Sequence, residues 1–349
     1  MASPQTMTAL VCRHDGYRRD DSGFRLDDLS AHVELADTAL PVPGEGQALI
    51  RMRMAAVNPS DIAFIKGVYG QPPVKGRPAG FEGVGEVVAS GPDGAADKYI
   101  GKRVAFATGR GGSGTWAQYA VAGVEGLIPL VPNVADADGA AMVVNPLTAL
   151  AMFDLVKESG AGSFVYSAAG SQLGKFLTGL ARDHGVAAIA VVRRAGQIGP
   201  LIDLGAKWAL DATGGDFDER LRMICRDEKP AIFLDAVTGA LGGRVFSAMG
   251  TGARWVIYGR MDNGPTVIPE PGQLIFQRKR IEGFWLTQWM RDQTPDKRFS
   301  VVMEAQTRFA TGKWSTDVTA VVPLAEAHAR LAAEMAKGDG KGFLTPRAG

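Results

Sequence analysis

Cysteine is scarce in this chain of 349 residues. Only Cys12 and Cys225 occur, far apart and with no other cysteine near either of them. Disulfide frameworks and cysteine-built zinc sites need several cysteines at short spacings. The sequence therefore excludes both kinds of structure and favours a reducing compartment.

An excess of charge of either sign is also missing. Lys and Arg number 38 against 37 Asp and Glu, which gives a formal net charge of +1. Binding of nucleic acid or of an anionic membrane surface usually needs a basic excess. We therefore expect neither as a partner.

Long hydrophobic runs are absent as well. The most apolar stretch, AAMVVNPLTALAMFDLV at 140–156, is interrupted by Asn145, Pro146 and Asp154, whereas a membrane-spanning helix needs about 20 consecutive apolar residues. The opening MASPQTMTAL has neither the basic flank nor the apolar core of a secretory signal. These features predict a soluble, cytoplasmic protein.

What the chain does contain is two different strand patterns. The length allows two domains of ordinary size. Up to about residue 140, glycine and proline separate short apolar runs, which is typical of a mostly β domain. The runs are ALIRMRMAAV (48–57), GVGEVVA (83–89), KRVAFAT (102–108) and AQYAVA (117–122).

From about residue 150, apolar strand candidates alternate with segments of helical length. This alternation predicts a parallel, doubly wound sheet. The strand candidates are SFVYSA (163–168), AAIAVV (187–192), KWALDA (207–212), AIFLDAV (231–237), RWVIYG (254–259) and RIEGFWL (280–286). The amphipathic segment at 323–338 and GKGFLTP at 340–346 are expected to return to the first domain.

The first two of these strands enclose a β-α-β unit of the size that binds dinucleotides. Aligned with the fingerprint G-x-G-x-x-G, the segment AGSQLG places Ala169 and Ser171 at the first two glycine positions and keeps Gly174. Small residues still permit a tight turn, although any α/β protein can contain such a turn without a ligand. The cofactor candidates here are Ala169, Gly170, Ser171, Gln172, Leu173 and Gly174.

The second strand of the unit ends in Arg193 and Arg194. Recognition of the NAD ribose calls for an acidic residue at about this distance, whereas a guanidinium pairs well with the 2′-phosphate of NADP. The alternative is that two arginines merely solvate a strand end. Within a β-α-β unit, the arginines favour NADPH as the cofactor.

Several motifs in fixed order resemble one family. They are AAVNPSDIAFIKGVYG (55–70), GRPAGFEGVGEVVASG (76–91), NPLTAL (145–150), the AxSxxG turn, VVRR (191–194) and IEGFWL (281–286). The series resembles the medium-chain dehydrogenase/reductase superfamily, and more narrowly its zinc-independent quinone oxidoreductases and mitochondrial-type 2-enoyl thioester reductases. The resemblance implies a GroES-like, mostly β catalytic domain (1–144 and 287–349) and a Rossmann NADP(H)-binding domain (145–286).

The chain departs from the zinc enzymes of that superfamily at the metal site. They have GHEGAG, whereas this chain has GFEGVG, so Phe81 replaces a histidine ligand and Asn58 stands where a cysteine ligand would be. No metal is expected, and Glu82 is interpreted as structural, pairing a basic group. The four histidines, His184 on a helix face and the isolated His14, His32 and His328, are interpreted as structural or surface residues.

Tyr69 in GVYG matches the tyrosine that the enoyl thioester reductases are thought to use as a proton donor. The alternative is a tyrosine that packs in a glycine-rich loop. Asn58 and Thr148 are secondary catalytic candidates, and Thr148 with Asn145 is expected to line the nicotinamide pocket, although such residues also cap helices. Further cofactor candidates lie at or after the ends of the last two strand candidates. The alternative for Phe284 and Trp285 is that they are simply buried at the last strand and at a subunit interface. The candidates are Tyr258, Gly259, Met261, Phe284 and Trp285.

The resemblance implies an NADPH-dependent reductase of an activated C=C bond or quinone, whose substrate is an enone, a quinone or a 2-enoyl thioester. The alternatives are a one-electron quinone reductase and an NADPH-binding structural or interaction protein with little turnover. Lys66, Lys75 and Arg77 are candidates for binding the phosphates of CoA, or else belong to a solvated loop. Relatives dimerise through the edge strand that RIEGFWL resembles, so we expect a homodimer.

Overall fold

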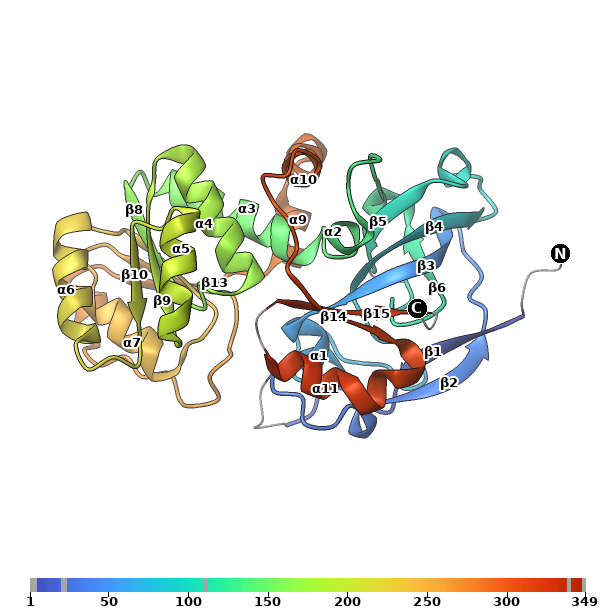
Figure 1. Ribbon diagram of the computed structural model, residues 1–349, viewed down its shortest axis with the longest axis horizontal. Helices are drawn as coiled ribbons and strands as arrows, with labels where there is room; N and C mark the ends of the chain where they lie inside the picture. Colours follow the sequence, from blue (N-terminus) through green and yellow to red (C-terminus); the bar gives the residue numbers. More distant parts are fainter. Residues whose placement is uncertain (1–4, 20–23, 110–111, 338–339, 347–349) are drawn as a thin grey trace. The chain divides into compact units, whose positions relative to one another are not determined.

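The computed structural model describes residues 5–19, 24–109, 112–337 and 340–346. The chain divides into two compact units, one of residues 1–145 and 302–349 and the other of residues 146–301. Both units are coloured along the sequence in Figure 1. No helix of the described segments is long and apolar enough to cross a membrane.

The first unit is built on a seven-stranded sheet in the order β14-β15-β3-β4-β5-β7, with β6 paired to β3. Its strands are β3 (Gln47–Val57), β4 (Glu82–Ser90), β5 (Arg103–Ala107), β6 (Tyr119–Gly123), β7 (Ile128–Pro129), β14 (Val318–Pro323) and β15 (Lys341–Thr345). A separate antiparallel pair joins β1 (Thr6–Cys12) to β2 (Val33–Ala39). The helices within this unit are α1 (Pro59–Ile65), α2 (Asp136–Ala140) and α11 (Ala327–Lys337).

In the middle of β3, buried apolar residues alternate with the exposed Arg51 and Arg53, so one face of the strand packs on the core. Ile50 and Met52 point into a core that also holds Phe106, Trp116 and, from α11, Leu331. The C-terminal strand β15 pairs antiparallel with the end of β3, opposite residues 55–57. The last strand of the chain therefore belongs to the same sheet as β3, in the first unit.

The second unit contains a six-stranded, all-parallel sheet in the order β10-β9-β8-β11-β12-β13. Its strands are β8 (Ser163–Tyr166), β9 (Ala187–Val192), β10 (Trp208–Asp211), β11 (Ile232–Asp235), β12 (Arg254–Ile257) and β13 (Arg280–Gly283). The chain runs outward from β8 in one direction and then from β11 in the other. The doubly wound sheet is therefore confirmed, and its strand order reverses between β8 and β11, which is where such sheets bind ligands.

Helices follow the strands of this sheet in the expected alternation. They are α3 (Val144–Glu158), α4 (Gln172–His184), α5 (Ile198–Leu204), α6 (Phe217–Glu228), α7 (Gly239–Ala248), α8 (Gly272–Phe276), α9 (Leu286–Asp292) and α10 (Pro295–Ala310), of which α3 and α10 cross the divisions between the units. On one side of the sheet, Phe217 of α6 and Phe246 of α7 join Trp255 of β12 in an apolar core. The Trp255 ring lies 5.3 Å from the Phe246 ring.

The division between the units differs from the expected one at its C-terminal end. The sequence suggested a return to the first domain at residue 287, whereas residues 287–301 group with the second unit. Lys297 of α10 forms an ion pair of 2.6 Å with Asp154 of α3. This ion pair links the segment to a helix of the second unit.

Gly174 is one of the positions of this fold at which a side chain would clash with the backbone. A Cβ atom there would lie 2.3 Å from the carbonyl oxygen of Ala169, because α4 packs directly on the turn that precedes it. We predict that Gly174→Ala lowers the free energy of unfolding by about 2 kcal/mol. Gly199→Ala is the control, since its Cβ would meet no atom within 4 Å in helix α5. Urea unfolding checks both variants, and equal stability of the two would contradict the packing argument.

Candidate functional site

The turn between β8 and α4 forms the loop that a dinucleotide would contact. Ala168 adopts a positive φ of 48°, and the Ser171 hydroxyl caps α4 by accepting the N–H of Gly174 at 3.1 Å. A Cβ atom on Gly170 would lie 2.4 Å from the side-chain amide of Gln197. The first N–H groups of a helix lack partners within the helix and are a common anion-binding site, so this turn stays a candidate for the pyrophosphate although two fingerprint glycines are absent.

Arg193 and Arg194 follow β9 directly and are both exposed. The register of the sheet also places Asp211, the last residue of β10, beside Val192. The sequence pattern did not indicate this carboxylate. Its Oδ1 atom accepts hydrogen bonds from the N–H and the hydroxyl of Thr213, at 2.9 and 2.8 Å. Asp211 thus closes its own turn, and the two guanidinium groups remain the prominent charges at the end of β9.

A buried carboxylate organises the carboxyl edge of the sheet. Asp235, at the end of β11, accepts hydrogen bonds from Ser167 Oγ at 2.6 Å, Trp255 Nε1 at 2.8 Å and the Val237 N–H at 2.8 Å. These bonds tie the end of β11 to the residue that follows β8 and to the Trp255 side chain of β12. Sequence reasoning missed Asp235, although an acidic residue inside an apolar strand signals a buried charge that needs partners.

Tyr258 follows β12 at the same edge. Burial, and secondarily the charge of Asp235, raises the pKa of its phenol. Its hydroxyl is buried and has no hydrogen-bond partner among the described residues. Buried hydroxyl groups are rarely left unsatisfied, so this orphaned donor is the second feature of the second unit that fits a bound ligand.

The other late candidates lie next to this edge within the second unit. A Cβ atom on Gly259 would lie 2.9 Å from the carbonyl oxygen of Ala236, and the N–H of Met261 donates to that oxygen at 3.0 Å. The Phe284 N–H donates to the Ile257 carbonyl at 2.8 Å, and Trp285 precedes α9. Both aromatic side chains are half-buried.

Thr148 and Asn145 both lie on α3. Asn145 is the second residue of the helix, and Thr148 follows three residues later on the same face, where it is buried. Neither is the residue that caps the helix. Their contact with a nicotinamide ring remains a proposal.

The first unit places Tyr69 against the residue that replaces a zinc ligand. The ring of Phe81 lies 5.2 Å from the ring of Tyr69 and 5.0 Å from the ring of Phe64. Tyr69 itself is half-buried. Phe81, which stands where the zinc enzymes have a histidine, therefore contacts two other aromatic rings.

Asn58 is held between two charged groups. It precedes α1 at the N-cap position, but its Nδ2 donates to Glu82 Oε1 at 2.9 Å and its Oδ1 accepts from the Lys341 ammonium. A carboxylate only accepts and an ammonium only donates, so the orientation of the amide is determined. Glu82 was expected to pair a basic group: Asn58 links it to the Lys341 ammonium, and the charge of Glu82 acts to raise the pKa of Lys341.

The second oxygen of Glu82 reaches the start of α3. Glu82 Oε2 accepts the N–H groups of Val143 at 3.0 Å and Val144 at 2.8 Å. Phe81 and Glu82 are adjacent at the start of β4, so one short segment contacts Tyr69 through a ring and Asn58 through a carboxylate. Two of the three catalytic candidates, Tyr69 and Asn58, thus contact residues that are adjacent in the sequence.

Asp61 adds a second buried carboxyl to this network. Its Oδ2 accepts the N–H of Asn58 at 2.7 Å, and burial, reinforced by Glu82, raises its pKa to about 7. Burial also lowers the pKa of Lys341, which Glu82 and Asp61 counteract. The sequence analysis did not single out Asp61 or Lys341. The spacing Asn58-x-x-Asp61, typical of a helix start, was the available signal for Asp61.

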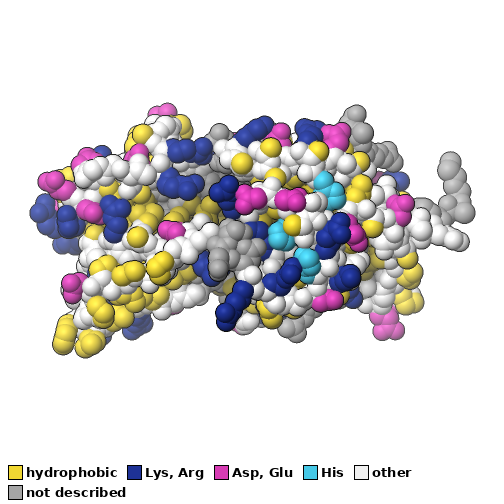
Figure 2. Space-filling model, turned by 90° about the horizontal axis from the view of Figure 1, so that it is seen from below, with side chains coloured by type: hydrophobic (Ala, Val, Ile, Leu, Met, Phe, Trp, Pro, Cys, Tyr) yellow, Lys and Arg dark blue, Asp and Glu magenta, His cyan; other side chains and the backbone are white. Residues whose placement is uncertain are grey.

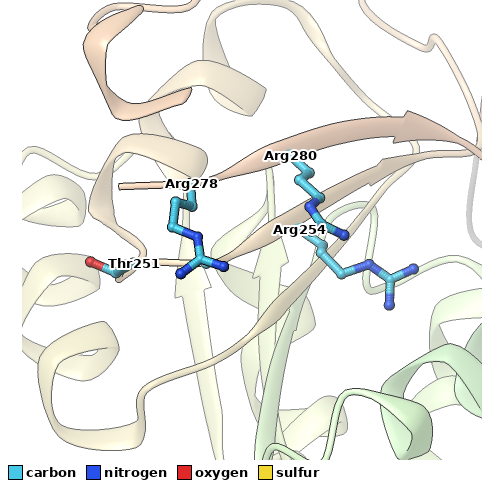
Figure 3. Close-up of a pocket in the computed structure, with 5 residues that line it drawn as sticks. Thr251, Arg254, Arg278 and Arg280 are labelled. Carbon is cyan, nitrogen blue, oxygen red and sulfur yellow. The ribbon is translucent and has the colours of Figure 1, made fainter. Parts of the chain in front are cut away.

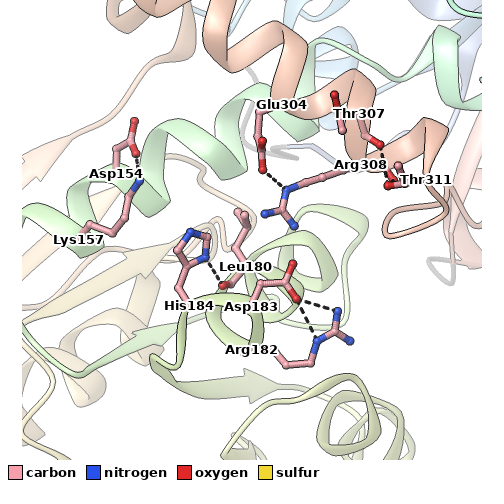
Figure 4. Close-up of polar contacts among 10 residues, drawn as sticks. All are labelled: Asp154, Lys157, Leu180, Arg182, Asp183, His184, Glu304, Thr307, Arg308 and Thr311. Carbon is pink, nitrogen blue, oxygen red and sulfur yellow. Dashed lines mark hydrogen bonds and ion pairs between the residues drawn. The ribbon is translucent and has the colours of Figure 1, made fainter.

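The histidines are less isolated than the sequence suggested. The rings of His14 and His32 lie 6.3 Å apart, edge to face, and His328 Nε2 lies 3.2 Å from the Val33 carbonyl. Figure 2 shows histidines gathered on one face. His184 Nδ1 lies 2.9 Å from the Leu180 carbonyl (Figure 4). No group of His, Cys, Asp and Glu in the described segments is arranged to hold a metal ion.

The raised pKa of Asp61 has a consequence for stability. The folded state binds this proton more tightly than the unfolded state, so the stabilising contribution is complete below about pH 4 and is lost as the pH rises through 7. Asp61→Asn keeps an acceptor for the Asn58 N–H but has no proton to lose. We predict that the free energy of unfolding of this variant, relative to that of the wild type, is higher at pH 8 than at pH 5. Urea unfolding at both pH values checks this, and a difference independent of pH would contradict it.

Comparison with known proteins agrees with both units. The model of the alcohol dehydrogenase GroES-like domain matches residues 44–133, and that of the zinc-binding dehydrogenase domain matches residues 173–303. The mitochondrial enoyl-[acyl-carrier-protein] reductase of Bos taurus is 30% identical over 93% of this chain and 84% of its own length. The human enzyme of that name is 30% identical over 96% and 87%.

Solved structures extend the likeness to the whole fold. A Mesorhizobium loti protein assigned as an NADPH:quinone reductase is 54% identical, with a TM-score of 0.95 over 99% of this chain and all of its own. The complex of Etr1p with NADP and crotonyl-CoA superposes with a TM-score of 0.78 over 97% of this chain and 99% of its own at 21% identity, which shows the fold alone. The chain belongs to the medium-chain dehydrogenase/reductase superfamily, in the branch of quinone oxidoreductases and 2-enoyl thioester reductases, with a GroES-like domain and a Rossmann-type domain.

Proposed function

We propose that this protein is an NADPH-dependent oxidoreductase that reduces the activated double bond of a 2-enoyl thioester without a zinc ion. The observation that carries the proposal is the packing of Phe81 on Tyr69, 5.2 Å between ring centres. A phenyl ring cannot ligate a metal, and the group beside it is a phenol. General acid chemistry from Tyr69 therefore replaces Lewis acid chemistry in this unit.

The residues for the cofactor follow from the second unit. The small-residue turn before α4 accommodates the pyrophosphate, Arg193 and Arg194 pair with the 2′-phosphate, and the orphaned Tyr258 hydroxyl donates to the nicotinamide half. Thr148 and Asn145 line the nicotinamide pocket in the same proposal. NADPH, when bound, supplies the hydride.

The chain's own residues must manage the charge and the proton. Reduction adds a hydride to the β-carbon of the enoyl thioester and a proton to the α-carbon, so negative charge develops on the carbonyl oxygen between the two additions. The phenol of Tyr69 donates a hydrogen bond to that oxygen or delivers the α-proton. Asn58, whose amide is fixed by Glu82 and Lys341, holds the start of α1 and thus the loop that ends in Tyr69.

Quinone reduction is the second candidate. It is favoured by the likeness to the Mesorhizobium loti protein at 54% identity. Quinone reduction needs no proton delivered to carbon, so it makes a weaker demand on Tyr69. A protein that binds NADPH but reduces neither an enoyl thioester nor a quinone would instead be a binding protein.

Two of the three cations considered for CoA phosphates remain available. Lys75 and Arg77 are exposed. Lys66 is buried, and its ammonium donates to the Arg25 carbonyl, so it belongs neither to a phosphate patch nor to a solvated loop.

The assembly proposed here is a homodimer through β13. This strand lies at the edge of the sheet, and its Ile281 is 37% exposed. An unpaired edge with an apolar side chain is a natural site for a second copy. A cytoplasmic location is proposed from the sequence, whereas the enoyl reductases named above are mitochondrial enzymes.

The arginine assignment predicts a specific loss. Arg193→Ala/Arg194→Ala should weaken NADPH binding by at least about tenfold, because a phosphate loses charge-assisted hydrogen bonds, while NADH binding changes little. Nicotinamide fluorescence titration measures both affinities, with Arg226→Ala as a control for removing exposed positive charge. Equal losses for the two cofactors would exclude the assignment.

The tyrosine assignment predicts a loss of turnover. Tyr69→Phe should lower kcat with crotonyl-CoA by about 10²-fold or more, with NADPH affinity unchanged. Tyr17→Phe is the matched control, since the Tyr17 hydroxyl donates to the neighbouring Gly70 carbonyl at 3.3 Å. Following NADPH oxidation with crotonyl-CoA and 1,4-benzoquinone side by side separates the two candidate functions. Undiminished crotonyl-CoA turnover in Tyr69→Phe would make Tyr69 a packing residue.

A further inference from the structure

A second positively charged site lies at the amino ends of the parallel strands, opposite the carboxyl ends where the cofactor candidates lie. A pocket of about 290 Å³ is lined by Thr251, Gly252, Arg254, Arg278 and Arg280 (Figure 3), and we call it the arginine pocket. Arg254 and Arg280 are the first residues of β12 and β13, whereas the cofactor candidates follow the last residues of those strands. Four residues of a strand span about 10 Å, so this pocket is separate from the cofactor edge.

The register of the sheet brings like charges together here. Arg254 is the direct partner of Arg280 across two parallel strands, so their side chains project from the same face. Like charges directly opposite each other destabilise a sheet. Glu282, two residues along β13, pairs with Arg254 at 2.7 Å, but none of the lining residues is acidic. Glu282 therefore neutralises Arg254, and Arg280 has no carboxylate partner of its own in the described part of the chain.

Arg278 adds a third guanidinium group, and its backbone adopts an unfavourable left-handed conformation. It follows the C-terminus of α8 with a φ of 54°, a conformation that glycine adopts far more easily. Neither Arg278 nor Arg280 has a side-chain hydrogen bond or an ion pair within the described part of the chain. Between them, Lys279 is buried, and its ammonium donates to the Phe246 carbonyl and to Gln273 Oε1. The segment thus carries three consecutive cations and no compensating carboxylate of its own.

We propose that the arginine pocket binds a phosphate group, held by Arg278 and Arg280 with Arg254 beside them. Two guanidinium forks match the oxygens of a phosphate dianion, and such an anion relieves the repulsion between the cross-strand arginines. Pairing of β13 with a second copy would use the hydrogen-bonding edge of the strand. The arginine side chains stand on its face, perpendicular to that edge, so a dimer and the site are compatible.

The test is calorimetric titration of the full chain with inorganic phosphate, at an ionic strength held constant with NaCl. The Arg193→Ala/Arg194→Ala background removes the proposed 2′-phosphate subsite, which keeps this result independent of the proposed reductase function. Saturable binding in that background, weakened at least about tenfold by Arg280→Ala or by Arg278→Gly, is expected. Arg222→Ala, an exposed arginine on α6, should leave binding unchanged.

Arg278→Gly also separates charge from folding. Because glycine adopts a φ of 54° without strain, this variant should melt at the wild-type temperature or above it while losing phosphate affinity. Titration with methyl phosphate distinguishes the source: equal binding indicates a phosphate monoester, and loss of binding indicates free phosphate. The proposal is overturned if phosphate produces no more heat than NaCl does, or if Arg278→Gly and Arg280→Ala bind phosphate as the background does.

Discussion

The carboxylate of Glu82 accepts three hydrogen bonds inside the first unit, one from Asn58 and two from the N–H groups of Val143 and Val144. Leaving a buried partner of this kind unsatisfied costs about 1–3 kcal/mol for each group. The start of β4, the N-terminus of α1 and the start of α3 are therefore fixed to one another. Phe81 precedes Glu82 in the chain, so the ring on which Tyr69 packs is positioned by the same constraint.

The second unit depends on a comparable arrangement. Asp235 links three adjacent strands through hydrogen bonds from Ser167 and Trp255. The turn from β8 to α4 is kept small because Gly174 touches the backbone of Ala169. Both units thus use one buried carboxylate to fix irregular backbone near a candidate site. In each, the groups proposed to meet a ligand, Tyr69 and Tyr258, are phenols that lie beside this rigid framework.

Local patterns in the sequence were enough to predict the sheets. β9 is a short, continuous apolar run, β11 is apolar up to its final Asp235, and the helix between β8 and β9 shows a 3.6-residue period. Short apolar runs and helical periodicity therefore identify these elements. Gly174 was predictable because only glycine allows that contact between helix and turn. The family resemblance, and no local physical rule, directed attention to Tyr69 and Asn58.

The polar networks could not be predicted in the same way. Lys341 meets Asn58 across 283 positions of the sequence, and no local spacing encodes such a pair. Asp211 comes to lie beside the end of β9 because β10 pairs in parallel with β9, and the register of that pairing is a property of the folded sheet. The grouping of residues 287–301 with the second unit could not be predicted either. It involves an ion pair between α10 and α3, which lie far apart in the sequence.

Reduction of crotonyl-CoA by NADPH in D₂O, with the product analysed by NMR, tests the central claim most directly. The account predicts NADPH-dependent butyryl-CoA with one deuterium on the α-carbon, delivered as the proton, and the nicotinamide hydrogen on the β-carbon. Absence of butyryl-CoA, or deuterium on the β-carbon in place of the nicotinamide hydrogen, would contradict a reductase that adds hydride and proton to an activated double bond.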